Sequence, residues 1–120
     1  MGRTLLVIDD ESGFAEMVLE YFRQSDYKVH AALNLEDAIM LFKQFKPDVV
    51  ILDYNMPMVT GEKFLPILHS LNPTVKVILI TGELEEEVKD KFKGMSYFAF
   101  FEKGNFSLEQ LKAKVEEALL

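Results

Sequence analysis

The sequence predicts an α/β fold in which five strand-helix pairs form a parallel sheet covered by helices. Runs rich in β-branched and aliphatic residues alternate with segments whose apolar residues recur at helical spacing. The run 49–52 is continuously apolar, which is typical of a central strand buried on both faces. The 120 residues, 49% of them hydrophobic, are enough for one compact core, so we expect residues 1–120 to form a single domain.

The expected elements follow from apolar spacing, caps and breakers. Asn34 is a typical N-cap, and the segment 107–110, Ser-Leu-Glu-Gln, matches a capping box. Strands are expected at Thr4–Ile8, Lys28–Ala32, Val49–Leu52, Val75–Ile80 and within Tyr97–Glu102. Helices are expected over about Ser12–Gln24, between Asn34 and Pro47, over about Gly61–Leu71, from Glu83 to about Phe92, and from Ser107 almost to the C-terminus.

Three of these helices carry more detailed expectations. Pro66 removes a backbone hydrogen bond from the interior of its helix, which predicts a kink or a short first segment. The run 85–87, three glutamates, predicts a solvated face. The second helix should bury Ala38, Ile39, Leu41, Phe42 and Phe45, and the first should bury Phe14, Met17, Val18, Tyr21 and Phe22.

Composition argues against several classes of protein. The chain has no cysteine, so disulfide and thiolate chemistry are not available. A formal net charge of −7, with dispersed Lys and Arg, argues against direct nucleic-acid binding. The N-terminal apolar run is too short for a signal sequence or a membrane span, so we expect a soluble, cytoplasmic protein.

Polar side chains follow four of the predicted strands. Asp9 and Asp10 follow the first strand, Asp53 the third, Thr81 the fourth and Lys103 the fifth. Open α/β sheets place ligand sites at the carboxyl ends of their strands. We therefore expect three carboxylates, a hydroxyl and an ammonium to converge on one crevice.

Three carboxylates in one crevice repel one another, so their negative charge must be reduced or balanced. At 4 Å each pair repels by about 4 kcal/mol with an effective dielectric near 20, so either one is protonated or a divalent ion binds. All-oxygen ligation favours Mg²⁺, and zinc is disfavoured because cysteine is absent and His30 and His69 lie far from these residues in sequence. A carboxylate beside Mg²⁺ can attack a phosphoryl group, with Lys103 and Thr81 contacting its oxygens.

The four pieces together resemble the receiver domain of two-component response regulators, over essentially the whole chain. The pieces are Val7-Ile8-Asp9-Asp10-Glu11, Leu52-Asp53-Tyr54-Asn55-Met56-Pro57, Thr81-Gly82 and Lys103. The resemblance implies a flavodoxin-like (βα)5 three-layer sandwich whose five parallel strands lie in the order 2-1-3-4-5.

The resemblance also implies a chemistry and partners. Asp53 would accept a phosphoryl group from a sensor histidine kinase or a histidine phosphotransfer protein, as in a phosphorelay. Mg²⁺, or Mn²⁺ in its place, would be held by Asp10, Asp53 and the backbone carbonyl of Asn55, with Asp9 acting mainly through water. Thr81 and Phe100 would form the switch that alters the surface of the fourth helix, last strand and last helix for a downstream protein target. The kinase would dock near Phe14 and the loop 104–106.

Departures from the family pattern give further expectations. Gly104 stands where a proline is usual and Asn105 resembles a one-residue insertion, which predicts a looser loop around Lys103. Phe100 lacks the hydroxyl of the commoner tyrosine. Asn55 and Glu83 match the pair of fast-turnover chemotaxis-type receivers, so we expect a short-lived phosphoryl state.

Alternatives to a phosphorylated receiver remain at this stage. One is an adaptor that works without phosphorylation. Another is a small Mg²⁺-dependent phosphohydrolase, disfavoured because Asn55 occupies the place of a second acid. In the favoured interpretation the chain is not an enzyme beyond its own phosphorylation and dephosphorylation. The sequence leaves open a stand-alone or excised receiver, and a monomer that dimerises on phosphorylation.

Overall fold

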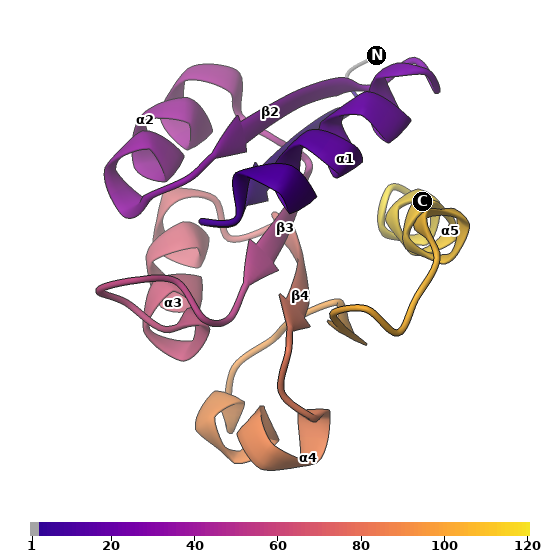
Figure 1. Ribbon diagram of the computed structural model, residues 1–120. Coiled ribbons are helices and arrows are strands. Elements are labelled where there is room, and N and C mark those ends of the chain that lie inside the picture. Colours follow the sequence, from indigo (N-terminus) through magenta and orange to yellow (C-terminus); the bar gives the residue numbers. More distant parts are fainter. Residues whose placement is uncertain (1–2) are drawn as a thin grey trace.

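The computed structural model describes residues 3–120, so the first two residues of the predicted domain lie outside the described part. Within that range a five-stranded parallel sheet has the order β2-β1-β3-β4-β5 and lies between two layers of helices (Figure 1). The predicted fold class and strand order are confirmed. The strands are β1 (Thr4–Ile8), β2 (Lys28–Ala32), β3 (Val49–Asp53), β4 (Lys76–Thr81) and β5 (Ala99–Glu102).

The helices divide the core into two clusters, one on each face of the sheet. The first face is covered by α1 (Ser12–Arg23) and α5 (Leu108–Ala118). The second is covered by α2 (Leu35–Phe45), α3 (Gly61–Leu71), and α4 (Glu85–Val88), which continues as the 3₁₀ helix η1 (Lys89–Phe92). None of the helices within residues 3–120 combines the length and apolar character needed to cross a lipid bilayer.

The central strands are buried on both faces because successive side chains point to opposite layers. In β1, Leu5 and Val7 belong to the cluster beneath α1 and α5, whereas Leu6 and Ile8 belong to the cluster beneath α2 and α3. Every residue of β1 and β3 is buried. This confirms the expectation drawn from the continuous apolar run in β3. The packing on both faces also holds the ends of β1 and β3 in place.

Helix α1 begins and ends close to its predicted bounds, but its buried stripe differs. Val18 and Phe22 are buried as predicted, whereas Met17 is 46% exposed, so that part of the prediction is wrong. The stripe uses Ala15 and Leu19 instead. These four residues have the spacing i, i+3, i+4, i+7 of one helix face, and Met17 lies about 100° from Val18 around the axis.

Helix α2 begins as predicted, because the Asn34 side chain accepts a hydrogen bond from the Asp37 backbone N–H at 2.9 Å. Its last predicted core residue, Phe45, is 38% exposed rather than buried, and its ring stacks on His30 with centroids 3.6 Å apart. The predicted capping box of α5 is confirmed, since the side chains of Ser107 and Gln110 each accept from the other's backbone N–H.

Helix α3 runs from Gly61 to Leu71 as one element that includes Pro66, so the expected short first segment is wrong. Phe64, Leu65 and Leu68 are each at most 1% exposed, and their packing stabilises the helix on both sides of the proline. Because Pro66 has no N–H, the Glu62 carbonyl loses its usual helical donor.

The fourth helix is much shorter than predicted. The α-helical part covers only Glu85–Val88, and Lys89–Phe92 forms a 3₁₀ turn. The three glutamates 85–87 are exposed, as expected. Only Val88 and Phe92 are buried in this segment, which gives a long regular helix little apolar surface to stabilise it.

Replacing Pro66 by Ala should stabilise the protein. Pro66 is exposed, and Ala restores the hydrogen bond to the Glu62 carbonyl, so we expect the free energy of unfolding to rise by about 1 to 3 kcal/mol. Urea denaturation would measure it, with Lys63→Ala, an exposed position of the same helix, as the control. A Pro66→Ala protein no more stable than the Lys63→Ala protein would show that the helix accommodates the proline without cost.

Candidate functional site

The predicted site residues meet at the carboxyl edge of the sheet. Asp53 and Thr81 are the last residues of β3 and β4, one residue beyond the predicted strand ends. Asp9 directly follows β1 and Lys103 directly follows β5. Because β1 pairs with β3, with Ile8 opposite Leu52, the next residues along the chain, Asp9 and Asp53, lie side by side.

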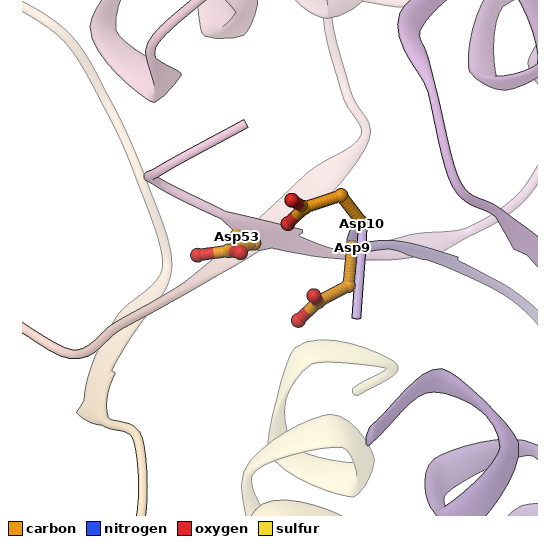
Figure 2. A group of neighbouring side chains, drawn as sticks. All are labelled: Asp9, Asp10 and Asp53. Atoms are coloured by element: carbon orange, nitrogen blue, oxygen red, sulfur yellow. The ribbon is translucent and has the colours of Figure 1, made fainter. Parts of the chain in front are cut away.

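The three aspartates form one acidic cluster. One carboxylate oxygen from each of Asp9, Asp10 and Asp53 lies within 4.8 Å of the other two. Figure 2 shows the Asp9 and Asp10 carboxylates turned toward the side on which Asp53 lies. Asp9 is 1% exposed and Asp53 is 4% exposed, whereas Asp10 is open to solvent. Two carboxylates are thus removed from water next to a third.

Backbone donors orient the two buried carboxylates. Asp9 Oδ1 accepts from the Glu11 N–H at 2.8 Å, and Asp53 Oδ1 accepts from the Asn55 N–H at 3.1 Å. In both cases the donor lies two residues after the acceptor, the geometry of an Asx turn, in which an aspartate bends the chain that leaves a strand.

Lys103 supplies the positive charge of the site. Its Nζ lies 2.9 Å from Asp9 Oδ2 and 3.5 Å from Asp53 Oδ2, and it also contacts Glu11. The ammonium lies 4.8 Å from the centroid of the Phe14 ring, a cation–π contact. One side chain therefore bridges the ends of β1, β3 and β5.

The loop after Lys103 begins as a hydrogen-bonded turn around Gly104. The Lys103 N–H donates to the Thr81 carbonyl at 2.6 Å, and the Asn105 N–H donates to the Glu102 carbonyl at 3.0 Å. Gly104 has φ +82°, a left-handed conformation that glycine adopts without a Cβ penalty.

Electrostatics distinguishes Asp53 from an ordinary surface acid. Burial and the neighbouring Asp9 carboxylate raise the pKa of Asp53 from 3.8 to about 6, against the opposing effects of the Asn55 N–H and of Lys103. Burial lowers the pKa of Lys103. Its contacts with Glu11 and Asp9 together raise this pKa by more than burial lowers it, so the pKa lies above its usual value. The lysine is charged throughout the range in which Asp53 titrates.

Thr81 is fully buried, and its hydroxyl oxygen connects two other predicted residues. It accepts from Asn55 Nδ2 at 3.2 Å and from the Glu83 N–H at 3.1 Å. Phe100 lies in β5, half-buried, with its ring 6.3 Å from that of Tyr97. The structure brings Asn55 and Glu83 to Thr81, whereas Phe100 lies opposite Leu79, two residues back from the carboxyl edge of the sheet.

The acidic cluster suits a hard divalent cation. Its donors are all oxygens, and burial together with Asp9 already penalises the ionised form of Asp53, which a bound cation would relieve. Asp9, Asp10 and Asp53 could therefore hold the ion. His30 and His69 do not belong to this cluster. The His30 ring stacks on Phe45, and His69 Nε2 lies 3.3 Å from the Val75 carbonyl oxygen.

Two contacts of the site were not expected from the sequence. The Glu11 carboxylate and the Phe14 ring both contact the Lys103 ammonium, from 92 and 89 positions earlier in the chain. The only sequence signal for Glu11 was its place next to the aspartate pair. Apolar periodicity assigned Phe14 to the core, and the family resemblance placed it at the kinase-docking surface, but neither predicted its contact with Lys103; its side chain is half-buried.

Comparisons with known proteins agree with the fold. The transcriptional regulatory protein TcrX of Mycobacterium tuberculosis is 36% identical over 93 residues, which is 78% of this chain and 39% of TcrX. The regulatory protein AtoC of Escherichia coli is 32% identical over 115 residues, which is 96% of this chain and 25% of AtoC. The chain thus spans well under half the length of these two relatives.

The structural comparison gives the same result. The response regulator protein TrrA of Thermotoga maritima, solved in complex with Mg²⁺ and BeF, superposes with a TM-score of 0.82 at 27% identity, covering 98% of this chain and 99% of TrrA. A family model described as the response regulator receiver domain matches residues 5–116. The chain therefore belongs to the response regulator receiver domain family, whose members act in phosphorylation-dependent two-component signalling.

Proposed function

We propose that Asp53 is the phosphoacceptor of this receiver and that Mg²⁺ assists the transfer. The observation that carries the proposal is the position of Asp53: a buried carboxylate at the end of β3, with the Lys103 ammonium 3.5 Å away and two further carboxylates within reach of one ion. A nucleophile, a cation to neutralise the transferred group and a metal-binding cluster thus meet at one point.

The chemistry is a phosphoryl transfer to oxygen. A carboxylate oxygen of Asp53 attacks phosphorus, the bond between phosphorus and the donor breaks, and the donor leaves with the bonding electrons. The donor is a phosphohistidine of a sensor kinase or phosphotransfer protein. Lys103 neutralises one phosphoryl oxygen. Thr81 donates to another, since both of its observed hydrogen bonds use the hydroxyl oxygen as acceptor.

Asp9, Asp10 and Asp53, with the backbone carbonyl of Asn55, would hold the metal. Bound there, Mg²⁺, or Mn²⁺ in its place, supplies charge neutralisation for the incoming phosphoryl group. The TrrA structure, which contains Mg²⁺ and BeF, supports this assignment by similarity. A later attack of water on phosphorus releases inorganic phosphate and restores Asp53.

The downstream effect is a change of surface. When the phosphoryl group draws Thr81 inward, the Phe100 ring can fill the space it leaves, and the surface of α4, β5 and α5 changes for a protein target. The kinase docks at Phe14 and the loop 104–106. This choice is supported by the edge contact between the Phe14 and Phe106 rings, whose centroids are 6.4 Å apart beside the site.

Residues 1–120 act as one receiver unit in the cytoplasm, monomeric before phosphorylation, without direct contact to nucleic acid or membrane. Beyond its own phosphorylation and dephosphorylation the chain has no enzymatic activity. The amide of Asn55 cannot protonate a leaving group, which argues against a phosphohydrolase.

Incubation with acetyl phosphate and Mg²⁺ should add one phosphoryl group, about 80 Da, to the wild type and none to Asp53→Asn. Intact mass spectrometry measures the adduct, which should be lost on chelation of the metal. A phosphomonoester substrate included as a control should not be turned over at enzyme-like rates. No adduct on the wild type, even with rapid trapping, would indicate an adaptor that works without phosphorylation.

Replacing Asp53 by Asn should stabilise the metal-free protein above pH 6. The pKa of Asp53 is raised on folding, so its ionised form opposes folding, and the neutral amide removes about 1 to 2 kcal/mol of that cost. The advantage of the variant should shrink as pH falls from about 6 toward 3.8, because the wild-type carboxyl then becomes protonated.

Urea denaturation in chelator-treated buffer measures this difference, with Asp26→Asn, an exposed left-handed position, as the matched control. Equal effects of the two substitutions at pH 7 would contradict it. Added Mg²⁺ should raise the unfolding temperature of the wild type more than that of Asp53→Asn, because the variant has lost one ligand.

The phosphoryl group should be short-lived. The Asn55 side chain and the Glu83 backbone N–H both donate to the Thr81 hydroxyl oxygen, and this pair of residues resembles that of fast-turnover receivers. The decay of the 80 Da adduct after removal of the donor measures the lifetime in Mg²⁺. A half-life of many hours at room temperature would contradict the expectation.

A further inference from the structure

Glu11 occupies the N-cap position of α1, but its side chain does not cap the helix. An N-cap side chain normally accepts from a backbone N–H in the first turn, and within the described residues Glu11 makes no such bond. Its Oε1 contacts Lys103 Nζ instead. The side chain is 64% exposed, so packing does not force it there. Attraction to the ammonium accounts for its position.

This contact engages the lysine that the phosphoryl group needs. In the unphosphorylated protein the Lys103 ammonium is shared among Glu11, Asp9 at 2.9 Å and Asp53 at 3.5 Å. Glu11 and Asp9 lie within hydrogen-bonding distance of the ammonium, whereas Asp53 at 3.5 Å forms an ion pair only. A phosphoryl group on Asp53 would bring further acceptors to this ammonium and would compete there with Glu11 and Asp9.

Glu11 is the partner most easily displaced. Asp9 is buried, so its carboxylate would lose a partner without gaining water, whereas the exposed Glu11 carboxylate is hydrated as soon as it is released. Lys103 also stays in place when Glu11 leaves, because its backbone N–H is bonded to Thr81 and its ammonium lies over the Phe14 ring. The exchange needs a side-chain movement only.

We propose that Glu11 is a positioning residue that holds Lys103 while Asp53 is unphosphorylated and competes with the phosphoryl group for the ammonium. This inference rests on the proposed function, because it concerns the same lysine. The Glu11 contact then sets how tightly the site retains a phosphoryl group, and weakening it should favour the phosphorylated form.

The test uses Glu11→Gln, which keeps the size of the side chain and removes its charge. With Mg²⁺ present, isothermal titration with beryllofluoride, a phosphoryl mimic, should show binding about two- to fivefold tighter than in the wild type, the range expected for loss of an exposed ion pair. The matched control is Glu16→Gln, which removes the same charge from an exposed position of α1 and should bind like the wild type.

A second comparison separates competition for Lys103 from a general effect of charge. In a Lys103→Gln background Glu11→Gln should no longer tighten binding, because the shared ammonium is gone. A tightening that persists there, or one that Glu16→Gln reproduces, would overturn the inference, as would equal affinities of Glu11→Gln and wild type. In each of those cases wild-type binding leaves the proposed function standing. A wild type that neither binds beryllofluoride nor accepts phosphate overturns both.

Discussion

The mutual repulsion of three carboxylates, opposed by one ammonium, is the constraint on which the site depends. Asp9 and Asp53 are nearly inaccessible to water, and Asp10 lies within reach of both. Lys103 offsets part of this charge, but the pKa of Asp53 still rises to about 6. The unphosphorylated site therefore carries an excess of negative charge that favours a divalent cation. The same charge opposes an approaching phosphate, so cation binding and phosphoryl transfer are physically linked.

Strand register converts this electrostatic requirement into geometry. Parallel pairing of β1 with β3 brings Asp9 next to Asp53, and pairing of β4 with β5 brings Thr81 next to Lys103, whose N–H bonds the Thr81 carbonyl at 2.6 Å. A one-residue slip would turn each side chain to the other face of the sheet. Because β1 and β3 are apolar on both faces, their hydrophobicity alone does not forbid such a slip. The close packing of Leu5 and Val7 on one face, and of Leu6 and Ile8 on the other, opposes it. The packing of the core thus positions the polar site.

Sequence patterns predicted the parts that depend on local periodicity. Apolar strands precede four of the site residues, which is why the sequence predicted Asp9, Asp53, Thr81 and Lys103. An error of one residue in a strand boundary does not change which polar residues lie at the strand ends. The contact of Glu11 with Lys103 was missed because it joins positions 92 residues apart, and no local pattern encodes the rotamer of an exposed side chain. The bounds of α3 were predicted correctly, but its continuity through Pro66 and the length of the fourth helix were not, because tertiary packing decides both. Helix α3 continues through its proline because one face is buried, and the fourth helix shrinks because only Val88 and Phe92 are.

That weak fourth helix lies against the residue that follows Asp53. The Tyr54 side chain is 2% exposed, and its ring centroid lies 5.8 Å from that of Phe92 in η1. A Cβ on Gly61 would come within 3.2–3.3 Å of both Tyr54 and Phe92, so the start of α3 packs closely against these two residues. Segments with few buried contacts open at the lowest free-energy cost. The Tyr54–Phe92 contact thus joins the residue after Asp53 to η1, which belongs to the segment of the second helical layer with few buried side chains.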